Sequence, residues 1–250
     1  MFVTSNKLYN YIRCRRFAAL HEPNSSTDIT LNDEYYQKTM MKFKDMFLGL
    51  NYYDGMPFEK DVNLTFDFHH NFKLSENYDF IIDNDKIYCL CLESSKIFLD
   101  YTYKSNEQYH QFFKKNSDDH FTMITGINDS INYQSKLDKL FSRSEETGYI
   151  LLKYGFMQYL YKNIYPDKDF KLHMVLLNED YVHDGSVFSK DIFHIFDFSN
   201  ISDFDSKIEI ALFRMINYIE LNDFTPCELV KTACSIGKSN ACKFINFCYG

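Results

Sequence analysis

The sequence predicts a mixed α/β or α+β protein with one substantial core. Its 250 residues are 45% hydrophobic and 25% charged, which is the composition of a globular chain long enough to bury a large core. Amphipathic segments open the chain, three strand-like segments follow, and a helix and a further strand come after them. Glycine and proline are scarce, with 8 and 4 residues, so collagenous and linker-rich architectures are excluded.

Two helices are expected at the beginning of the chain. Thr4, Ser5 and Asn6 offer an N-cap for a helix that reaches about residue 20. Asn32 and Asp33 offer another N-cap for the amphipathic stretch 35–50.

A meander of three strands is expected next, after a turn at residues 54–57. Hydrophobic residues alternate with polar ones from Val62 to Phe68, which is the period of a half-buried strand. Strands are also predicted at 78–83 and 86–93, and the polar residues between them indicate a hairpin.

The second half of the chain is expected to hold a helix, two strands and a last helix. Residues 104–140 are polar and weakly periodic, which favours helices and loops. Apolar spacing predicts a helix at 146–164, a strand at 170–176, a short strand at 192–198 and an amphipathic helix at 203–221.

Several classes of protein do not fit the sequence. Apolar runs are too short for a membrane-spanning helix, and the first residues do not have the pattern of a secretory signal, so we expect a cytoplasmic protein. No complete phosphate-binding loop, dinucleotide fingerprint or zinc-protease motif is present. The net charge of −8 disfavours broad adhesion to phosphate backbones, so any nucleic-acid contact requires a local basic patch.

Cysteines are the residues with the clearest metal-binding potential. Cys234, Cys242 and Cys248 lie in the last 17 residues, and Cys14 lies alone near the N-terminus. In a reducing cytoplasm, four thiolates can hold a cubane iron-sulfur cluster or a tetrahedral zinc ion, and the spacing does not choose between them. Unligated burial is the alternative, and Cys227 is a spare ligand.

Three segments resemble the iron-sulfur RecB-like nucleases of the PD-(D/E)XK superfamily. Residues 5–17, with Cys14 after a short helix, resemble the opening of these proteins, of which the CRISPR-associated adaptation nuclease is the best known. Leu177–Gly185 and Ala241–Cys248 resemble an uncharacterised bacterial family of the same superfamily.

The resemblance implies a restriction-endonuclease-like core with N-terminal helices and a cysteine-rich iron-sulfur segment. It divides the chain into an N-terminal helical segment at 1–58, a nuclease-like core at 59–200, and a final helix with the cluster segment at 201–250, all as one structural unit. It also implies that one N-terminal and three C-terminal cysteines hold a 4Fe-4S cluster. These four residues are Cys14, Cys234, Cys242 and Cys248.

The nuclease site implied by the resemblance is degenerate. Such a site needs an Asp at the end of one strand and Glu-x-Lys on the next, so that two carboxylates hold Mg2+ or Mn2+ and the lysine positions the attacking water. Asp79 fits the first position, but Cys91 replaces the Glu and Glu93 replaces the Lys. A thiol is a poor ligand for a hard cation, and a carboxylate cannot supply the positive charge. A rearranged site would pair Asp79 with Glu93, with Lys96 reaching in from the next turn.

Other residues are assigned roles by the resemblance or by their charge. Gln158 matches a glutamine of the helix after the core, which lies near the active site in the family; an exposed or helix-capping amide is the alternative. Arg13, Arg15 and Arg16 are candidates for phosphate contacts, and a solvated basic turn is the alternative. Cys89 and Cys91 face the same side of their strand, which favours burial.

Three functions remain open on the sequence alone. The first is a DNA-processing protein with a degenerate nuclease site that binds DNA, or a partner nuclease or exonuclease domain, without cutting. The second is an active divalent-metal-dependent DNA nuclease with a rearranged site. The third is an interaction module with no nucleic-acid role, which the acidic balance permits.

Overall fold

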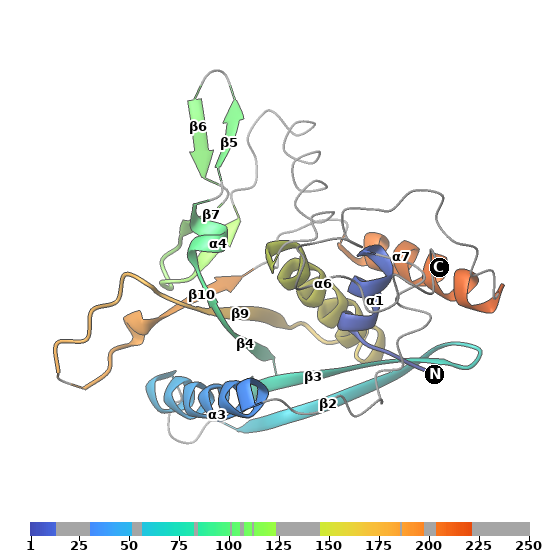
Figure 1. Cartoon of the computed structure of the whole chain (residues 1–250), viewed down its shortest axis with the longest axis horizontal. Coiled ribbons are helices and arrows are strands. Elements are labelled where there is room, and N and C mark those ends of the chain that lie inside the picture. The colour runs from blue at the N-terminus through green and yellow to red at the C-terminus, as the bar shows by residue number, and fades with distance from the viewer. Residues whose placement is uncertain are drawn as a thin grey trace.

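A mixed β-sheet with helices on both faces forms the centre of the molecule (Figure 1). The structure is a computed structural model, and it describes residues 1–13, 31–51, 57–82, 85–100, 102–105, 108–111, 113–123, 146–185, 187–197 and 204–221. Within these ranges, eight strands form the main sheet in the order β1-β3-β4-β9-β10-β8-β7, and β2 also pairs with β3. The mixed α/β class predicted from the sequence is therefore confirmed.

The described elements have the following bounds. The strands are β1 (Phe2–Val3), β2 (Phe58–His69), β3 (Phe72–Ile82), β4 (Lys86–Ser94), β5 (Thr102–Ser105), β6 (Gln108–Gln111), β7 (Phe113–Lys115), β8 (Phe121–Met123), β9 (Lys171–Leu177) and β10 (Phe193–Asp197). The helices are α1 (Ser5–Arg13), α3 (Leu31–Asn51), α4 (Lys96–Leu99), α6 (Glu146–Ile164), the 3-10 helix η1 (Lys190–Ile192) and α7 (Phe204–Glu220).

Strand β3 is the hub of the sheet. It pairs with β2 along its length in an antiparallel hairpin closed by a turn at His70 and Asn71. On its other side, the beginning of β3 pairs with β1 and its end pairs with β4. The predicted meander of three strands is thus confirmed, although β3 begins at Phe72, earlier than the alternation had indicated.

Strands β4 and β9 are parallel neighbours, with α6 lying between them in the sequence. β10 returns antiparallel to β9, and β8 and β7 extend the sheet beyond it. The predicted helix 146–164, the two predicted strands and the last helix are all present. The described residues therefore follow the expected order of helix, meander, helix and strand.

Side chains of successive residues point to opposite faces of the sheet and form two core clusters. In β9, Leu172 and Met174 pack in the larger cluster with α1, α6 and α7, whereas Val175 packs in the smaller cluster with Phe47 of α3. α3 and α6 consequently cover opposite faces of the sheet, as Figure 1 shows.

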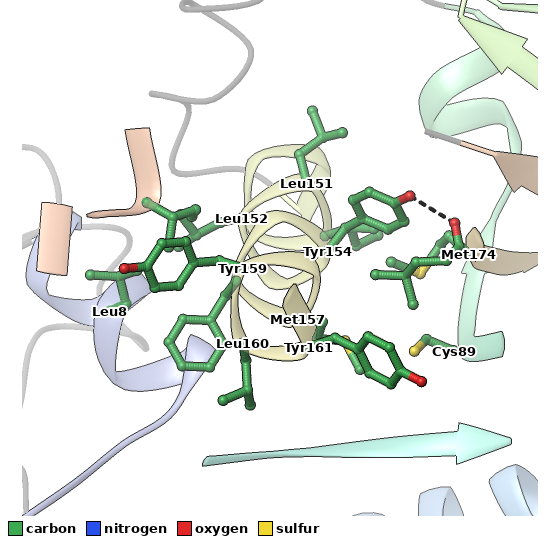
Figure 2. Close-up of a cluster of buried hydrophobic side chains, with 14 of the residues drawn as sticks. Leu8, Cys89, Leu151, Leu152, Tyr154, Met157, Tyr159, Leu160, Tyr161 and Met174 are labelled. Atoms are coloured by element: carbon green, nitrogen blue, oxygen red, sulfur yellow. Dashed lines mark hydrogen bonds between the residues drawn. The ribbon is translucent and has the colours of Figure 1, made fainter. Parts of the chain in front are cut away.

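Helix α6 is buried around almost its whole circumference. Figure 2 shows Tyr154 and Tyr161 pointing toward the sheet, while Leu152 and Tyr159 point toward Leu8 of α1. A helix that is apolar on all sides is typical of a position between two layers, here the sheet and the pair α1 and α7.

Two buried tyrosine hydroxyls join α6 to the sheet. The hydroxyl of Tyr154 donates to the carbonyl oxygen of Leu172 at 2.7 Å, and that of Tyr78 donates to the carbonyl oxygen of Met157 at 2.7 Å. Each hydroxyl crosses from one layer to the other, so the bonds fix how α6 lies on the sheet.

The prediction of helices and loops for residues 104–140 was wrong for its described part. This part holds β6, β7 and β8 and the end of β5. These strands have three or four residues each. β5 pairs with β6 and β7 pairs with β8 as neighbouring segments, and β8 also pairs with β10. Such short polar strands have no detectable period, because pairing rather than an apolar face defines them.

The helix expected to reach residue 20 is described only as α1, and the rest of it lies outside the described residues. The division of the chain at residues 58 and 200 stays a prediction. None of the described helices is both long and apolar enough to span a membrane.

Candidate functional site

Asp79 lies where β3 and β4 separate. The two strands pair only from Phe80 with Tyr88 to Ile82 with Lys86. Beyond that point the backbone N–H of Leu90 donates to Oδ2 of Asp79 at 2.7 Å. The carboxylate therefore takes the place of a backbone carbonyl as the partner of the Leu90 amide, and it lies between the two strands.

The pattern of buried side chains changes at Asp79. Tyr78 packs in the cluster beneath α6, and Phe80 stacks on Phe47 of α3 with ring centroids 5.9 Å apart. In a regular strand these two residues would share a face. Opposite Asp79, between the pairs Lys60–Phe80 and Val62–Tyr78, Asp61 has a φ of 53°. Both strands are thus irregular at the same level, which brings two aspartates together.

Lys44 of α3 connects these aspartates. Its ammonium lies 2.6 Å from Oδ1 of Asp79 and also forms an ion pair with Asp61. The side chains of Lys44 and Asp79 are only 15% and 17% exposed. Burial alone would lower the pKa of Lys44, but hydrogen bonds to Asp61 and Asp79 raise it above its ordinary value. The lysine is therefore a fixed positive charge in contact with Asp79.

Cys91 and Glu93 follow on β4 on the face toward α6. Burial raises the pKa of the Cys91 thiol, so the thiol is protonated at neutral pH. The positive charge of Lys153, on α6, acts in the opposite direction on both Cys89 and Cys91. Cys89 is buried in the core, which agrees with the expectation from its strand position.

Lys153 is a residue of this region that was not singled out from the sequence. The signal that could have identified Lys153 is its place in the sequence: it lies within the apolar helix α6, one position before the buried Tyr154. A cation between the buried residues of such a helix requires a polar neighbour on the adjoining layer.

Lys96 lies beside the loop that follows β9. Its ammonium is 3.0 Å from Asp180 and 3.6 Å from Glu179, and the three side chains are exposed. The ion pairs of Lys96 are with this loop, whereas Asp79 is paired with Lys44.

Gln158 is buried, in contrast to the exposed amide that was one expectation. It lines a cavity of about 350 Å3 with Phe170 and Leu172, at the beginning of β9. Asp79, Glu93 and Lys96 are absent from the lining of this cavity. The role of Gln158 beside Asp79 stays a prediction.

These residues do not fit a bound divalent metal ion. Both oxygens of Asp79 already have partners, in Lys44 and the Leu90 amide. The neutral thiol of Cys91 is not an oxygen ligand, and the described residues contain no group of three histidine, cysteine or acidic side chains placed to hold a metal. This geometry therefore supports no nuclease step through Mg2+.

The expected cluster cysteines lie outside the described residues. The same holds for Arg15 and Arg16, while Arg13 is the last residue of α1. The residues expected to bind the cluster, with the spare, are Cys14, Cys227, Cys234, Cys242 and Cys248.

Comparison with known proteins adds little. No protein-family model matches the chain, and no curated protein matches it. An alkaline exonuclease from Laribacter hongkongensis is a weak structural match, with a TM-score of 0.34 and 8% identity, over 88% of this chain and 91% of that chain. A likeness at this level establishes neither a family nor an activity.

Proposed function

We propose that the protein is a nuclease-like DNA-processing protein that binds DNA without cleaving it. The observation that carries the proposal is the ammonium of Lys44 at 2.6 Å from Asp79. A carboxylate held by an internal cation and a backbone amide is a poor ligand for a second cation. The replacement of the family's Glu and Lys by Cys91 and Glu93 supports the same conclusion.

The order of elements also supports the proposal. The hydrophobic pattern of the sequence predicted helices, a meander, a helix and a strand, and α3, the meander β2 to β4, α6 and β9 follow that order. Asp79, the first residue of the implied site, lies where the meander opens between β3 and β4.

An iron-sulfur cluster is the second part of the proposal, with Cys14, Cys234, Cys242 and Cys248 as ligands. Its support within the described residues is the packing of α1 against α7, where the rings of Tyr11 and Tyr218 have centroids 6.0 Å apart. Arg13, next to Cys14 in the sequence, and Glu220, which ends α7 ahead of the other cysteines, therefore belong to neighbouring helices.

Cleavage and binding measured together test the DNA proposal. Anaerobically purified protein is incubated with single- and double-stranded DNA in Mg2+ or Mn2+, beside Asp79→Asn. We expect no cleavage by either protein, and equal DNA affinity. Replacing Arg13, Arg15 and Arg16 by Gln should weaken binding, because these cations are the expected phosphate contacts.

Two results would contradict this function. Cleavage that Asp79→Asn abolishes would establish the active nuclease, with Asp79 released from Lys44. A folded protein that neither cleaves nor binds DNA would favour the interaction module.

The cluster has its own test. Brown protein with about four iron and four sulfide per chain is expected for a 4Fe-4S cluster. Replacing Cys242 by Ser should remove most of the iron, while Cys89→Ser should not. Stoichiometric zinc in place of iron would overturn the assignment.

A further inference from the structure

The cavity at Gln158 does not include Asp79 in its lining, and Gln158 carries an unexplained polar group. It holds about 350 Å3 between the second half of α6 and the segment that leads into β9. This volume is at the lower end of the range of small-molecule sites, roughly 300 to 1,000 Å3, and suits one nucleoside.

Gln158 is the reason to expect a ligand there. The residue is only 7% exposed, and its Oε1 is buried without a hydrogen-bond partner in the part of the chain that the structure describes. Burying an amide oxygen without a partner is unfavourable, so such an atom calls for an explanation. A half-turn of the amide exchanges its oxygen and nitrogen, so Gln158 can offer a ligand either an acceptor or a donor.

Other groups in the lining restrict the chemistry of the ligand. Asp169, an exposed residue of the lining, supplies a carboxylate. Phe170 supplies an aromatic wall, held in place by Tyr161 with ring centroids 4.5 Å apart. A flat heterocycle that carries N–H donors would satisfy the carboxylate and the amide and would pack on the ring.

Two lysines add positive charge at the cavity. Lys162 is held by Asp205 at 2.6 Å, and Lys168 lies over the ring of Tyr165, 5.1 Å from its centroid. Both ammonium groups are anchored by contacts that leave donors available, and ammonium groups are suited to phosphate.

We propose that this cavity binds a nucleotide whose base carries an exocyclic amino group, as adenine does. Gln158 and Asp169 contact the base, and Lys168 contacts the phosphate. The nucleotide is either free or a unit of a nucleic-acid strand; in the second case the proposal rests on the proposed DNA function.

Calorimetric titration with AMP, adenosine and dTMP tests the base and the phosphate separately. We expect AMP to bind and dTMP to bind at least about tenfold more weakly, because thymine has no amino group and would leave acceptors unpaired. Gln158→Met removes the amide in a side chain of similar length and should weaken AMP and adenosine by about tenfold. Lys168→Ala should weaken AMP and leave adenosine unchanged.

Controls keep a folding defect apart from a binding defect. Lys73→Ala removes an exposed lysine of β3 that pairs with Asp67, and its AMP affinity should equal that of the natural protein. Lys168 is exposed, so Lys168→Ala serves as the second test if Gln158→Met fails to fold.

Competition separates the two sources of the nucleotide. If the cavity takes a unit of a strand, oligo(dA) displaces AMP and oligo(dT) does not; if it takes a free nucleotide, neither displaces AMP. Equal affinity for AMP and dTMP, unchanged affinity in Gln158→Met, or no binding at about 5 mM AMP would overturn the proposal. These outcomes do not depend on the arginine variants that test DNA binding.

Discussion

At the residue scale, Lys44 supplies the positive charge beside Asp79 that a metal ion would supply in a nuclease site. It neutralises Asp79 and Asp61, which the irregular backbone of β2 and β3 places opposite each other. Removing it would leave two carboxylates of like charge side by side, one of them largely buried.

Lys44→Met should therefore destabilise the fold. The substitution keeps the length of the side chain but removes the charge, and we expect a loss of about 1 to 3 kcal/mol in the free energy of unfolding by urea, because a largely buried carboxylate loses its partner. Lys60→Met removes the exposed ion pair with Asp45 and should cost less than about 1 kcal/mol. Equal losses in the two variants would contradict the special role of Lys44.

His173 on β9 is the residue from which a pH dependence follows. Its ring is 2% exposed and stacks on Tyr88, with ring centroids 4.8 Å apart. Burial lowers the pKa of His173 to about 4. The negative charge of Asp197 raises this pKa, whereas His120 and Lys171 lower it further.

The free energy of unfolding should fall as the pH falls from about 6.5 to about 4. Over that window the unfolded chain binds a proton at His173 that the folded chain does not. The contribution of His173 to stability is therefore complete above the unfolded pKa and is lost as the pH falls toward the folded pKa, by roughly 2 to 3 kcal/mol. His173→Phe keeps an aromatic ring against Tyr88 and should flatten much of the decline in urea titrations. His70→Phe, at an exposed turn, should leave the decline intact; a decline unchanged in His173→Phe would refute the assignment.

At the element scale, the position of α6 depends on the hydroxyls of Tyr78 and Tyr154. Tyr78→Phe and Tyr154→Phe should each lower the free energy of unfolding by about 1 to 2 kcal/mol, because each removes one buried hydrogen bond between α6 and the sheet. Tyr165→Phe, at an exposed ring, is the control and should change stability by less than about 0.5 kcal/mol. Thermal or urea unfolding of the three variants measures the difference.

The long elements could be predicted because each has enough apolar residues to show a pattern. The alternation from Val62 to Phe68 and the apolar spacing of 146–164 correspond directly to β2 and α6. Strands β1, β5, β6, β7 and β8 could not be predicted in this way, since each has two to four residues, too few to show a period.

The candidate site could be predicted only in part. The resemblance pointed to Asp79, but the ion pair with Lys44 depends on how α3 packs on the sheet, which no local pattern encodes. Gln158 was singled out, yet its place in the wall of a cavity depends on the position of α6 over the beginning of β9.

At the scale of the whole molecule, the net charge of −8 limits how DNA can be bound. If Arg13, Arg15 and Arg16 are the phosphate contacts, log K should fall with log salt with a slope of about −3 on duplex DNA, since each contact contributes about −0.9. Replacing one arginine by Gln should reduce the slope by about 1, measured by fluorescence anisotropy. A slope steeper than about −6 would mean that a larger basic surface takes part.

The pairing of β4 with β9 has a consequence for the kinetics of folding. The hairpin of β2 and β3 is local, whereas Lys86 pairs with Lys171 across roughly 85 positions of the chain. Closing so long a loop is slow, so we expect the hairpin to form before the parallel pair. In stopped-flow measurements, Leu74→Ala should mainly slow refolding, and Val175→Ala should mainly accelerate unfolding. The paired strands β2 and β3, which hold Asp61 opposite Asp79, would then form before β9 pairs with β4.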